Sequence, residues 1–247
     1  MKLTFVGSGD AFGTGGRFNT CFHVEAARQC FLIDCGASSL VALKQRGIDR
    51  NSVGQIFISH LHGDHFGGLP FFLLDAQLVS GRTEKLTIAG PPGMKDRLLA
   101  AMEILFVGSS KILWNFDLEI VDIRLETSTD ICGSEVFTRE VSHPSGAPST
   151  ALRIKLDDKI IAYSGDTEWT GVLLPIARDA DLFICECYMF ERVVKFHLSY
   201  SIIMQHFDDL AAKRLVLTHM GEDMMAHLDQ VDISRVTIAE DGLVIEF

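Results

Sequence analysis

The sequence has no long hydrophobic run. A membrane-spanning helix needs roughly 18 or more consecutive apolar residues, and the longest candidate here, Leu98–Val107, is interrupted by Glu103. The amino terminus becomes glycine-rich after Val6 and lacks the apolar core and small-residue cleavage site of a secretory signal. These absences predict a soluble, cytoplasmic protein with no membrane partner.

Basic residues are also scarce. The 247 residues include 22 Lys and Arg against 33 Asp and Glu, a formal net charge of −11. A long nucleic-acid-binding surface normally requires a surplus of basic side chains, so the balance argues against one. A small anionic substrate remains compatible with this charge, because bound divalent cations make a site locally attractive to anions.

No C-x-x-C pair occurs among the six cysteines. This absence argues against a structural zinc knuckle and against a thioredoxin-like redox site. Because unpaired cysteine usually packs as a small hydrophobic side chain, we expect buried free thiols. The cysteines are Cys21, Cys30, Cys35, Cys132, Cys185 and Cys187.

Short apolar runs separated by helix-length segments make up most of the chain, with 47% hydrophobic residues. This pattern predicts an α/β or α+β fold in which helices cover sheets. No Pro- or Ser-rich linker or low-complexity tract divides the sequence, so we expect one domain over residues 1–247. The segments that predict helices are Ser38–Arg46, Gly67–Val79, Gly93–Val107, Gly171–Arg178, Ser199–Ala212 and Asp223–Leu228.

Several of the apolar runs end in a residue that can bind a metal. The residues that follow such runs are Asp34, His60, His143, Asp166 and His219. Polar side chains at the same ends of several buried strands can converge at one edge of a sheet, where a rigid scaffold presents a site. The placement therefore predicts a single polar centre.

The strongest local pattern is His60-Leu61-His62-Gly63-Asp64-His65, directly after an apolar strand. In an extended segment, residues two apart point the same way, so His60 and His62 can hold one cation together. The turn at Gly63 directs Asp64 and His65 elsewhere, which suits a second cation close by. Imidazole and carboxylate are the ligands that borderline divalent metals prefer.

This H-x-H-x-D-H pattern resembles the signature of the metallo-β-lactamase superfamily, and the later elements follow in the family's order. The resemblance implies a four-layer αββα sandwich with two divalent metal ions at the edge between its sheets, zinc first and manganese or iron as alternatives. Asp34 is expected to fix a loop beside the metals. The implied ligands are His60, His62 and His143 for the first metal, Asp64, His65 and His219 for the second, and Asp166 as the bridge.

Two further elements are similar to the ribonuclease Z-like branch of the superfamily. One is the glycine-rich loop Gly7–Gly16, which could contact substrate or simply connect strands. The other is His197-Leu198-Ser199, which fits the position of an extra histidine in that branch. Such a histidine can protonate a leaving alkoxide. The alternative is that Ser199 caps a helix and His197 is only its neighbour.

The combined pattern predicts a metal-dependent hydrolase, a phosphodiesterase in which a metal-bridging hydroxide attacks the substrate. Asp166 would set the metal spacing, Asp64 would orient the hydroxide, and His197 would act as general acid. The alternatives are hydrolysis of a carboxylic ester, lactone or thioester at the same metals, and a non-catalytic metal-binding sensor.

Substrate size can also be predicted. The tRNA 3′-processing members of the branch carry a protruding arm between the third metal histidine and the bridging aspartate, whereas His143 and Asp166 are only 23 positions apart here. We therefore expect a small phosphodiester or nucleotide-type substrate, for example a cyclic or oligonucleotide-derived one, in preference to tRNA. The apolar segment Pro70–Leu74 is a candidate homodimer interface.

Overall fold

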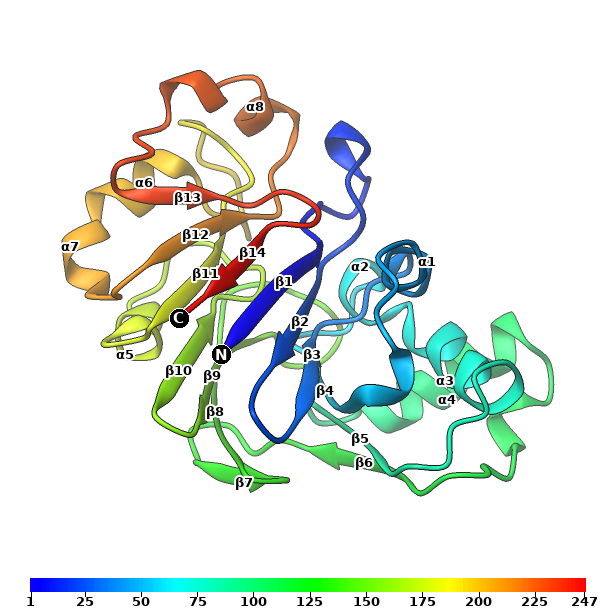
Figure 1. The fold of residues 1–247 in the computed structure, drawn as a ribbon. Coiled ribbons are helices and arrows are strands. Elements are labelled where there is room, and N and C mark those ends of the chain that lie inside the picture. The colour runs from blue at the N-terminus through cyan, green and yellow to red at the C-terminus, as the bar shows by residue number, and fades with distance from the viewer.

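The computed structural model describes residues 1–247 and contains two seven-stranded sheets that face one another (Figure 1). In spatial order the first sheet comprises β14 (Val244–Glu246), β1 (Lys2–Gly7), β2 (Cys21–Glu25), β3 (Cys30–Ile33), β4 (Val53–Phe57), β5 (Leu86–Gly90) and β6 (Leu118–Asp122). The second comprises β13 (Val236–Ile238), β12 (Leu215–Thr218), β11 (Leu182–Glu186), β10 (Lys159–Tyr163), β9 (Thr150–Leu156), β8 (Ser134–Glu140) and β7 (Thr129–Ile131).

Helices cover the outer face of each sheet (Figure 1). The first sheet carries α1 (Ser39–Gln45), α2 (Gly63–Phe66), α3 (Leu69–Leu78) and α4 (Met94–Leu105). The second carries α5 (Leu173–Ala177), α6 (Tyr200–Gln205), α7 (Phe207–Leu210) and α8 (Glu222–Met225). Short 3₁₀ turns are η1 (Thr14–Gly16), η2 (Arg50–Ser52), η3 (Ser109–Lys111) and η4 (Leu228–Gln230). None of these helices combines the length and apolar character needed to cross a bilayer.

Period-two alternation along the strands builds three apolar layers. In β3, Phe31 and Ile33 face the core between the sheets, whereas Leu32 faces α1 and α3. In β11, Ile184 faces the same central core and Phe183 faces the other helices. Successive strand side chains point to opposite faces, so a strand that is apolar throughout is covered on both sides. The four-layer αββα sandwich expected from the sequence is confirmed.

Two details of the sequence analysis are corrected. The segment Ser199–Ala212 is two short helices, because the backbone of His206 leaves the helical region (φ −110°) where its ring stacks on Trp169 at 3.8 Å. All six cysteines are free as expected, but Cys132 is exposed and Cys30 is half-buried.

The strands that precede the predicted site residues run in the same direction within each sheet. β3 and β4 are parallel, as are β10, β11 and β12, and β8 runs parallel to β10 because both are antiparallel to β9. Their carboxyl ends therefore meet at one edge of the sandwich. Ser59 joins the two sheets at this edge, since its carbonyl accepts hydrogen bonds from the amide (3.0 Å) and hydroxyl (2.8 Å) of Thr150.

Close backbone packing holds the α2 turn against the first sheet. The amide of Cys35 donates to the carbonyl of His65 at 2.6 Å. Gly36 lies directly against the backbone of Asp64, and a Cβ at position 36 would overlap the Asp64 carbonyl oxygen and approach Asn19 Cβ to 2.5 Å. A glycine is required where two backbones approach this closely.

We therefore expect Gly36→Ala to displace α2, to lower the free energy of unfolding by about 1–3 kcal/mol, as overpacking generally does, and to weaken metal binding. Urea denaturation and metal analysis of the purified variant measure both effects. Gly171→Ala is the matched control, because nothing lies within 4 Å of a Cβ at that position. Equal stability and metal content in the two variants would contradict the expectation.

Candidate metal centre

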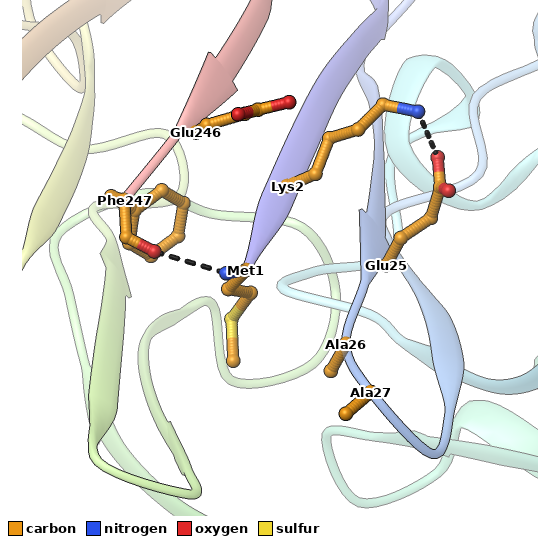
Figure 2. Close-up of a pocket in the computed structure, with 7 residues that line it drawn as sticks. All are labelled: Met1, Lys2, Glu25, Ala26, Ala27, Glu246 and Phe247. Atoms are coloured by element: carbon orange, nitrogen blue, oxygen red, sulfur yellow. Dashed lines mark hydrogen bonds and ion pairs between the residues drawn. The ribbon is translucent and has the colours of Figure 1, made fainter.

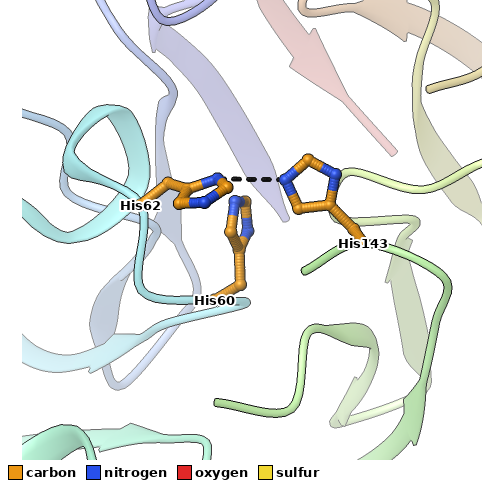
Figure 3. A group of neighbouring side chains, drawn as sticks. All are labelled: His60, His62 and His143. Carbon is orange, nitrogen blue, oxygen red and sulfur yellow. Dashed lines mark hydrogen bonds between the residues drawn. The ribbon is translucent and has the colours of Figure 1, made fainter. Parts of the chain in front are cut away.

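Three histidines from both sheets meet at the common edge. His60 follows β4, His62 precedes α2, and His143 follows β8. Figure 3 shows the three rings turned toward one another, with His62 Nδ1 and His143 Nε2 3.0 Å apart. The His60 ring lies 5.0 Å from that of His62 and 4.9 Å from that of His143, and one nitrogen of each ring lies within 4.8 Å of the others. This spacing suits three ligands of a single cation.

A second group lies beside the first and consists of Asp64, His65, Asp166 and His219. His65 Nε2 and His219 Nε2 are 3.4 Å apart, and each lies 3.1 Å from Asp64 Oδ2. Asp166 follows β10 and His219 follows β12, so the second sheet supplies half of this group.

Asp166 lies between the two groups. Its Oδ2 atom is 3.4 Å from Nε2 of both His65 and His219, and 3.8 Å and 3.9 Å from Nε2 of His60 and His143. One carboxylate oxygen is therefore near four imidazole nitrogens. This is the placement that a bridging carboxylate requires.

The donor set fits divalent cations. His60 Nε2 and Asp166 Oδ1 are buried and make no hydrogen bond, although buried polar atoms are normally paired. The imidazole nitrogens of His62 and His143 face one another, as do those of His65 and His219. A cation bound by both nitrogens of such a pair would be stabilised by their lone pairs. Imidazole and carboxylate together suit zinc and other borderline divalent ions. The chain therefore presents a divalent metal-binding site.

The charges within the centre compensate one another. Burial lowers the pKa of His60 well below its usual range, so its imidazole is neutral. Burial also lowers the pKa of His219, but Asp166 and the hydrogen bond to Asp64 together outweigh that effect and raise the pKa to about 9. The pKa of His65 is raised in the same way. Although burial raises the pKa of Asp64, the neighbouring His65 holds it below its usual range. Cations would replace these protons, since metal ligands bind deprotonated.

Asp34 anchors this centre from behind. Its carboxylate accepts from the amide (2.7 Å) and hydroxyl (2.8 Å) of Ser59, and its Oδ2 lies 2.7 Å from His65 Nδ1. The pairing directs His65 Nε2 toward Asp166 and sets the tautomer of the ring. Asp34 has a left-handed backbone (φ +58°), which is costly outside glycine and is found where surrounding contacts enforce it.

The carbonyl of Phe196 orients His143 in a similar way, since it lies 2.9 Å from His143 Nδ1. Phe196 also has a left-handed backbone (φ +69°). The next residue is His197, so one short turn both positions a candidate ligand and carries the candidate general acid.

His197 lies against both groups. Its ring centroid is 5.0 Å from that of His143 and 5.8 Å from that of His219. His197 Nδ1 is 3.2 Å from both carboxylate oxygens of Glu186. Burial lowers the pKa of His197, but the pairing with Glu186 outweighs it and raises the pKa above its usual value. Ser199 caps α6 by accepting from the Ile202 amide, as the capping alternative expects, and the role of His197 as general acid stays a prediction.

Glu186 is a site residue that sequence reasoning missed. It ends β11 and is fully buried, and burial raises the pKa of its carboxyl group. The signal was available: Glu186 is another polar residue at the end of an apolar run, like Asp166 and His219. The sequence does not single out Glu186, because it lies between Cys185 and Cys187 and because one carboxylate by itself is not a motif.

A surface hollow of about 560 Å³ lies elsewhere (Figure 2). Its lining includes Lys2, paired with Glu25 at 2.7 Å, and Met1, whose amino group donates to the Phe247 carbonyl at 3.0 Å. β1 begins here and runs in the same direction as β4, so this hollow is at the end of the sheet opposite His60. It contributes no residue to the metal centre.

We expect Asp34→Asn to lower metal affinity about 10- to 100-fold, as loss of a carboxylate behind a metal-binding histidine usually does. Asparagine tolerates the left-handed backbone at position 34, so the change removes charge without adding strain. Chelator competition monitored by metal analysis measures the affinity. Asp75→Asn is the control, because this buried carboxylate pairs with Lys44 and Arg50 away from the histidines. Unaltered affinity in Asp34→Asn would exclude the orienting role.

Sequence relatives agree with this geometry. Human zinc phosphodiesterase ELAC protein 1 is 30% identical over 152 residues, which cover 60% of this chain and 40% of that protein. The chain thus spans well under two thirds of that relative. Ribonuclease Z of Bacillus velezensis is 26% identical, and the match covers 90% of this chain and 88% of that enzyme.

Solved structures agree as well. The metallo-β-lactamase fold protein YhfI from Bacillus subtilis superposes with a TM-score of 0.79 at 19% identity, covering 99% of both chains. The short form of human tRNase Z has a TM-score of 0.78 at 27% identity, covering 100% of this chain and 99% of that one. The expected resemblance to the ribonuclease Z-like branch of the metallo-β-lactamase superfamily is confirmed. The family described as Anti-Pycsar protein Apyc1 matches residues 1–243, nearly the whole chain, and this protein therefore belongs to that family.

Proposed function

We propose that this protein is a metal-dependent phosphodiesterase that acts on a small phosphodiester and serves as an anti-Pycsar protein. The observation that carries the proposal is the Glu186–His197 pair, held against both groups of candidate ligands. A metal-dependent hydrolase of carboxylic esters does not require a general acid at this place, whereas cleavage of a phosphodiester benefits from a proton donor to the leaving oxygen.

The proposed centre binds two divalent cations, with zinc as the first choice. Such cations supply an activated water and neutralise charge on the phosphoryl oxygens. His60, His62 and His143 would hold one cation, and Asp64, His65 and His219 the other, with Asp166 between them. The name of the human relative, zinc phosphodiesterase ELAC protein 1, supports this metal.

The remaining chemistry belongs to the chain itself. Asp64 accepts a hydrogen bond and can orient the attacking water, because its Oδ2 lies at the centre of the second group. His197 presents Nδ1 to Glu186, which leaves Nε2 to donate a proton to the leaving alkoxide. Glu186 stabilises the imidazolium form of His197, so the proton is in place before the bond breaks.

A small substrate suits the region between His143 and Asp166. The only strands there are β9 and β10, which form a short antiparallel hairpin joined at Asp157 and Asp158. No arm projects from this hairpin to hold a tRNA, and the net charge of −11 disfavours a polynucleotide surface. These features favour a small diester over the tRNA substrates of the relatives named tRNase Z.

Hydrolysis of a carboxylic ester, lactone or thioester is the second candidate, because the same metal ligands would serve it. The two functions differ in their dependence on His197. An acyl hydrolase would tolerate the loss of this imidazole, whereas a phosphodiesterase would not.

We also propose a homodimer, but through a surface that differs from the predicted one. Within Pro70–Leu74 only Phe71 is exposed, since Phe72 and Leu73 pack inside. Phe71 instead contacts Phe106 at 5.2 Å, beside the exposed end of α4. The resulting apolar surface comprises Phe71, Ile104, Leu105, Phe106 and Val107. Clustered exposed apolar side chains of this kind usually mark an interface.

The first test is hydrolysis of bis(p-nitrophenyl) phosphate by zinc-loaded or manganese-loaded protein. We expect His197→Ala to lower kcat by about 10²- to 10⁴-fold, the usual contribution of a general acid, for a diester with an alkoxide leaving group such as a cyclic nucleotide, with unchanged metal content. The loss with bis(p-nitrophenyl) phosphate should be smaller, because p-nitrophenolate leaves without protonation. Glu186→Gln should also lower kcat, because His197 loses the carboxylate that stabilises its protonated form. His206→Ala is the control, since that ring stacks on Trp169 outside the centre.

Full activity in His197→Ala would return this residue to a structural role, whereas no phosphodiester turnover by metal-loaded wild-type protein would favour the acyl hydrolase. Full activity and unchanged metal content in His62→Ala would exclude the proposed metal-dependent mechanism. If zinc-loaded wild-type protein bound the metal yet cleaved no phosphodiester and no carboxylic ester, the non-catalytic sensor would be the better description.

For the dimer, we expect wild-type protein to have twice the chain mass by light scattering, and Val107→Glu to shift it to the monomer mass. Val107 is 90% exposed, so the new charge would disrupt an interface without disturbing the core. Ile233→Glu is the control at a separate exposed site. A monomeric wild-type protein would contradict the proposal.

A further inference from the structure

A hollow of about 400 Å³ adjoins the metal centre on the side of His197. It lies between the glycine-rich loop after β1, the segment after β11 and the start of α8. Its lining residues are Asp10, Phe12, Thr14, Tyr188, Met189, Glu222 and Asp223. None of them belongs to the candidate ligands.

Tyr188 belongs both to the lining of this hollow and to the surroundings of the candidate catalytic groups. Its ring lies 4.7 Å from the ring of His197 and 6.2 Å from that of His219, and it also lines the hollow. Gly221 permits this position, because a Cβ there would lie 2.8 Å from Tyr188 Cε2. Burial, with the carboxylates of Asp10 and Glu222, raises the pKa of Tyr188, so its phenol remains neutral.

The loop that carries Phe12, a second aromatic residue of the lining, is closed by hydrogen bonds. Asp10 accepts hydrogen bonds from the amide (2.8 Å) and hydroxyl (2.7 Å) of Thr14 and from the amide of Phe12, which closes the loop around its carboxylate. Asp241 fixes the base of the loop by accepting from Ser8 and Phe18. Phe12 is 85% exposed, so an apolar surface is presented at the rim of the hollow.

The charge of the hollow is negative. Asp10, Glu222 and Asp223 contribute carboxylates, and no basic side chain lines it. A second phosphate group would be repelled here. A flat uncharged ring could instead pack against the aromatic residues of the lining, and hydrogen-bond donors on such a ring could bind its carboxylates.

We propose that this hollow, the Phe12–Tyr188 subsite, binds the aromatic part of the alcohol that leaves a phosphodiester substrate. The inference rests on the proposed function, because His197 must protonate the leaving oxygen and the leaving group therefore lies beside His197 and Tyr188. The subsite selects a leaving group with a neutral or amino-bearing ring, such as a nucleoside, and excludes one that carries a further phosphate. Such a subsite would favour a single diester over a polynucleotide.

Calorimetric titration of the zinc-loaded protein tests the subsite without any turnover. The probes are methylphosphonate, phenylphosphonate and 4-carboxyphenylphosphonate, which share the metal-binding group and differ only in the substituent. We expect phenylphosphonate to bind about tenfold more tightly than methylphosphonate, in the range that stacking on one aromatic side chain provides. 4-Carboxyphenylphosphonate should lose most of this gain in affinity, because its carboxylate is repelled by the acidic side chains of the hollow.

Variants assign the effect to the named residues. Tyr188→Ala should reduce the preference for phenyl over methyl to less than about twofold, whereas Tyr188→Phe should retain it because the ring remains. Phe12→Ala, at an exposed position with little effect on folding, should reduce the preference partially. Glu222→Gln should improve binding of 4-carboxyphenylphosphonate, whereas Glu246→Gln, at the far end of the sheet, should not.

The outcomes separate this inference from the proposed function. Equal affinity for the phenyl and methyl probes, or a preference that survives in both Tyr188→Ala and Phe12→Ala, would overturn the subsite even if the protein cleaves diesters. A preference that depends on Tyr188 would support the subsite even if bis(p-nitrophenyl) phosphate is not cleaved, in which case only the proposed reaction would fail.

Discussion

The buried carboxylate of Asp166 is the constraint on which the site depends. Its Oδ2 lies within 3.9 Å of four imidazole nitrogens that come from both sheets. A buried charge is costly unless it is compensated, so the histidines must be held around it in a fixed arrangement. The strands β4, β8, β10 and β12 provide that arrangement, because the residues that follow their carboxyl ends meet at a single edge.

Outer contacts determine how the inner rings point. Asp34 directs His65, the carbonyl of Phe196 directs His143, and Glu186 directs His197. Two of these partners, Asp34 and Phe196, have left-handed backbones that cost free energy and persist only where the surroundings enforce them. The strained backbones that orient the histidines lower the stability of the fold, and burial in the three apolar layers offsets that cost.

The segment from Glu186 to His197 links the separate parts of the site. It begins with the carboxylate that orients His197, continues through Tyr188 at the wall of the subsite, and ends at the turn whose carbonyl contacts His143. A shift of this segment would move His197, the ring of His143 and the wall of the hollow together. If His197 is the general acid, the proposed orientation of the leaving group and its protonation would be coupled through one stretch of backbone.

Much of the molecule could be predicted from the sequence. The alternation of apolar residues indicated strands covered on both faces, and the dense run from His60 to His65 indicated a metal centre, because both signals are local. The interval from His143 to Asp166 similarly leaves room only for a hairpin.

Other features were decided only by the tertiary structure. Glu186 sits in an apolar strand, and its pairing with His197 becomes visible once β11 and the following turn are folded together. The hollow between Phe12 and Tyr188, and the contact of Phe71 with Phe106, likewise join residues distant in the chain. The physical reason is that side-chain spacing along a strand or turn is set by local backbone geometry, whereas these contacts depend on how separate elements pack against one another.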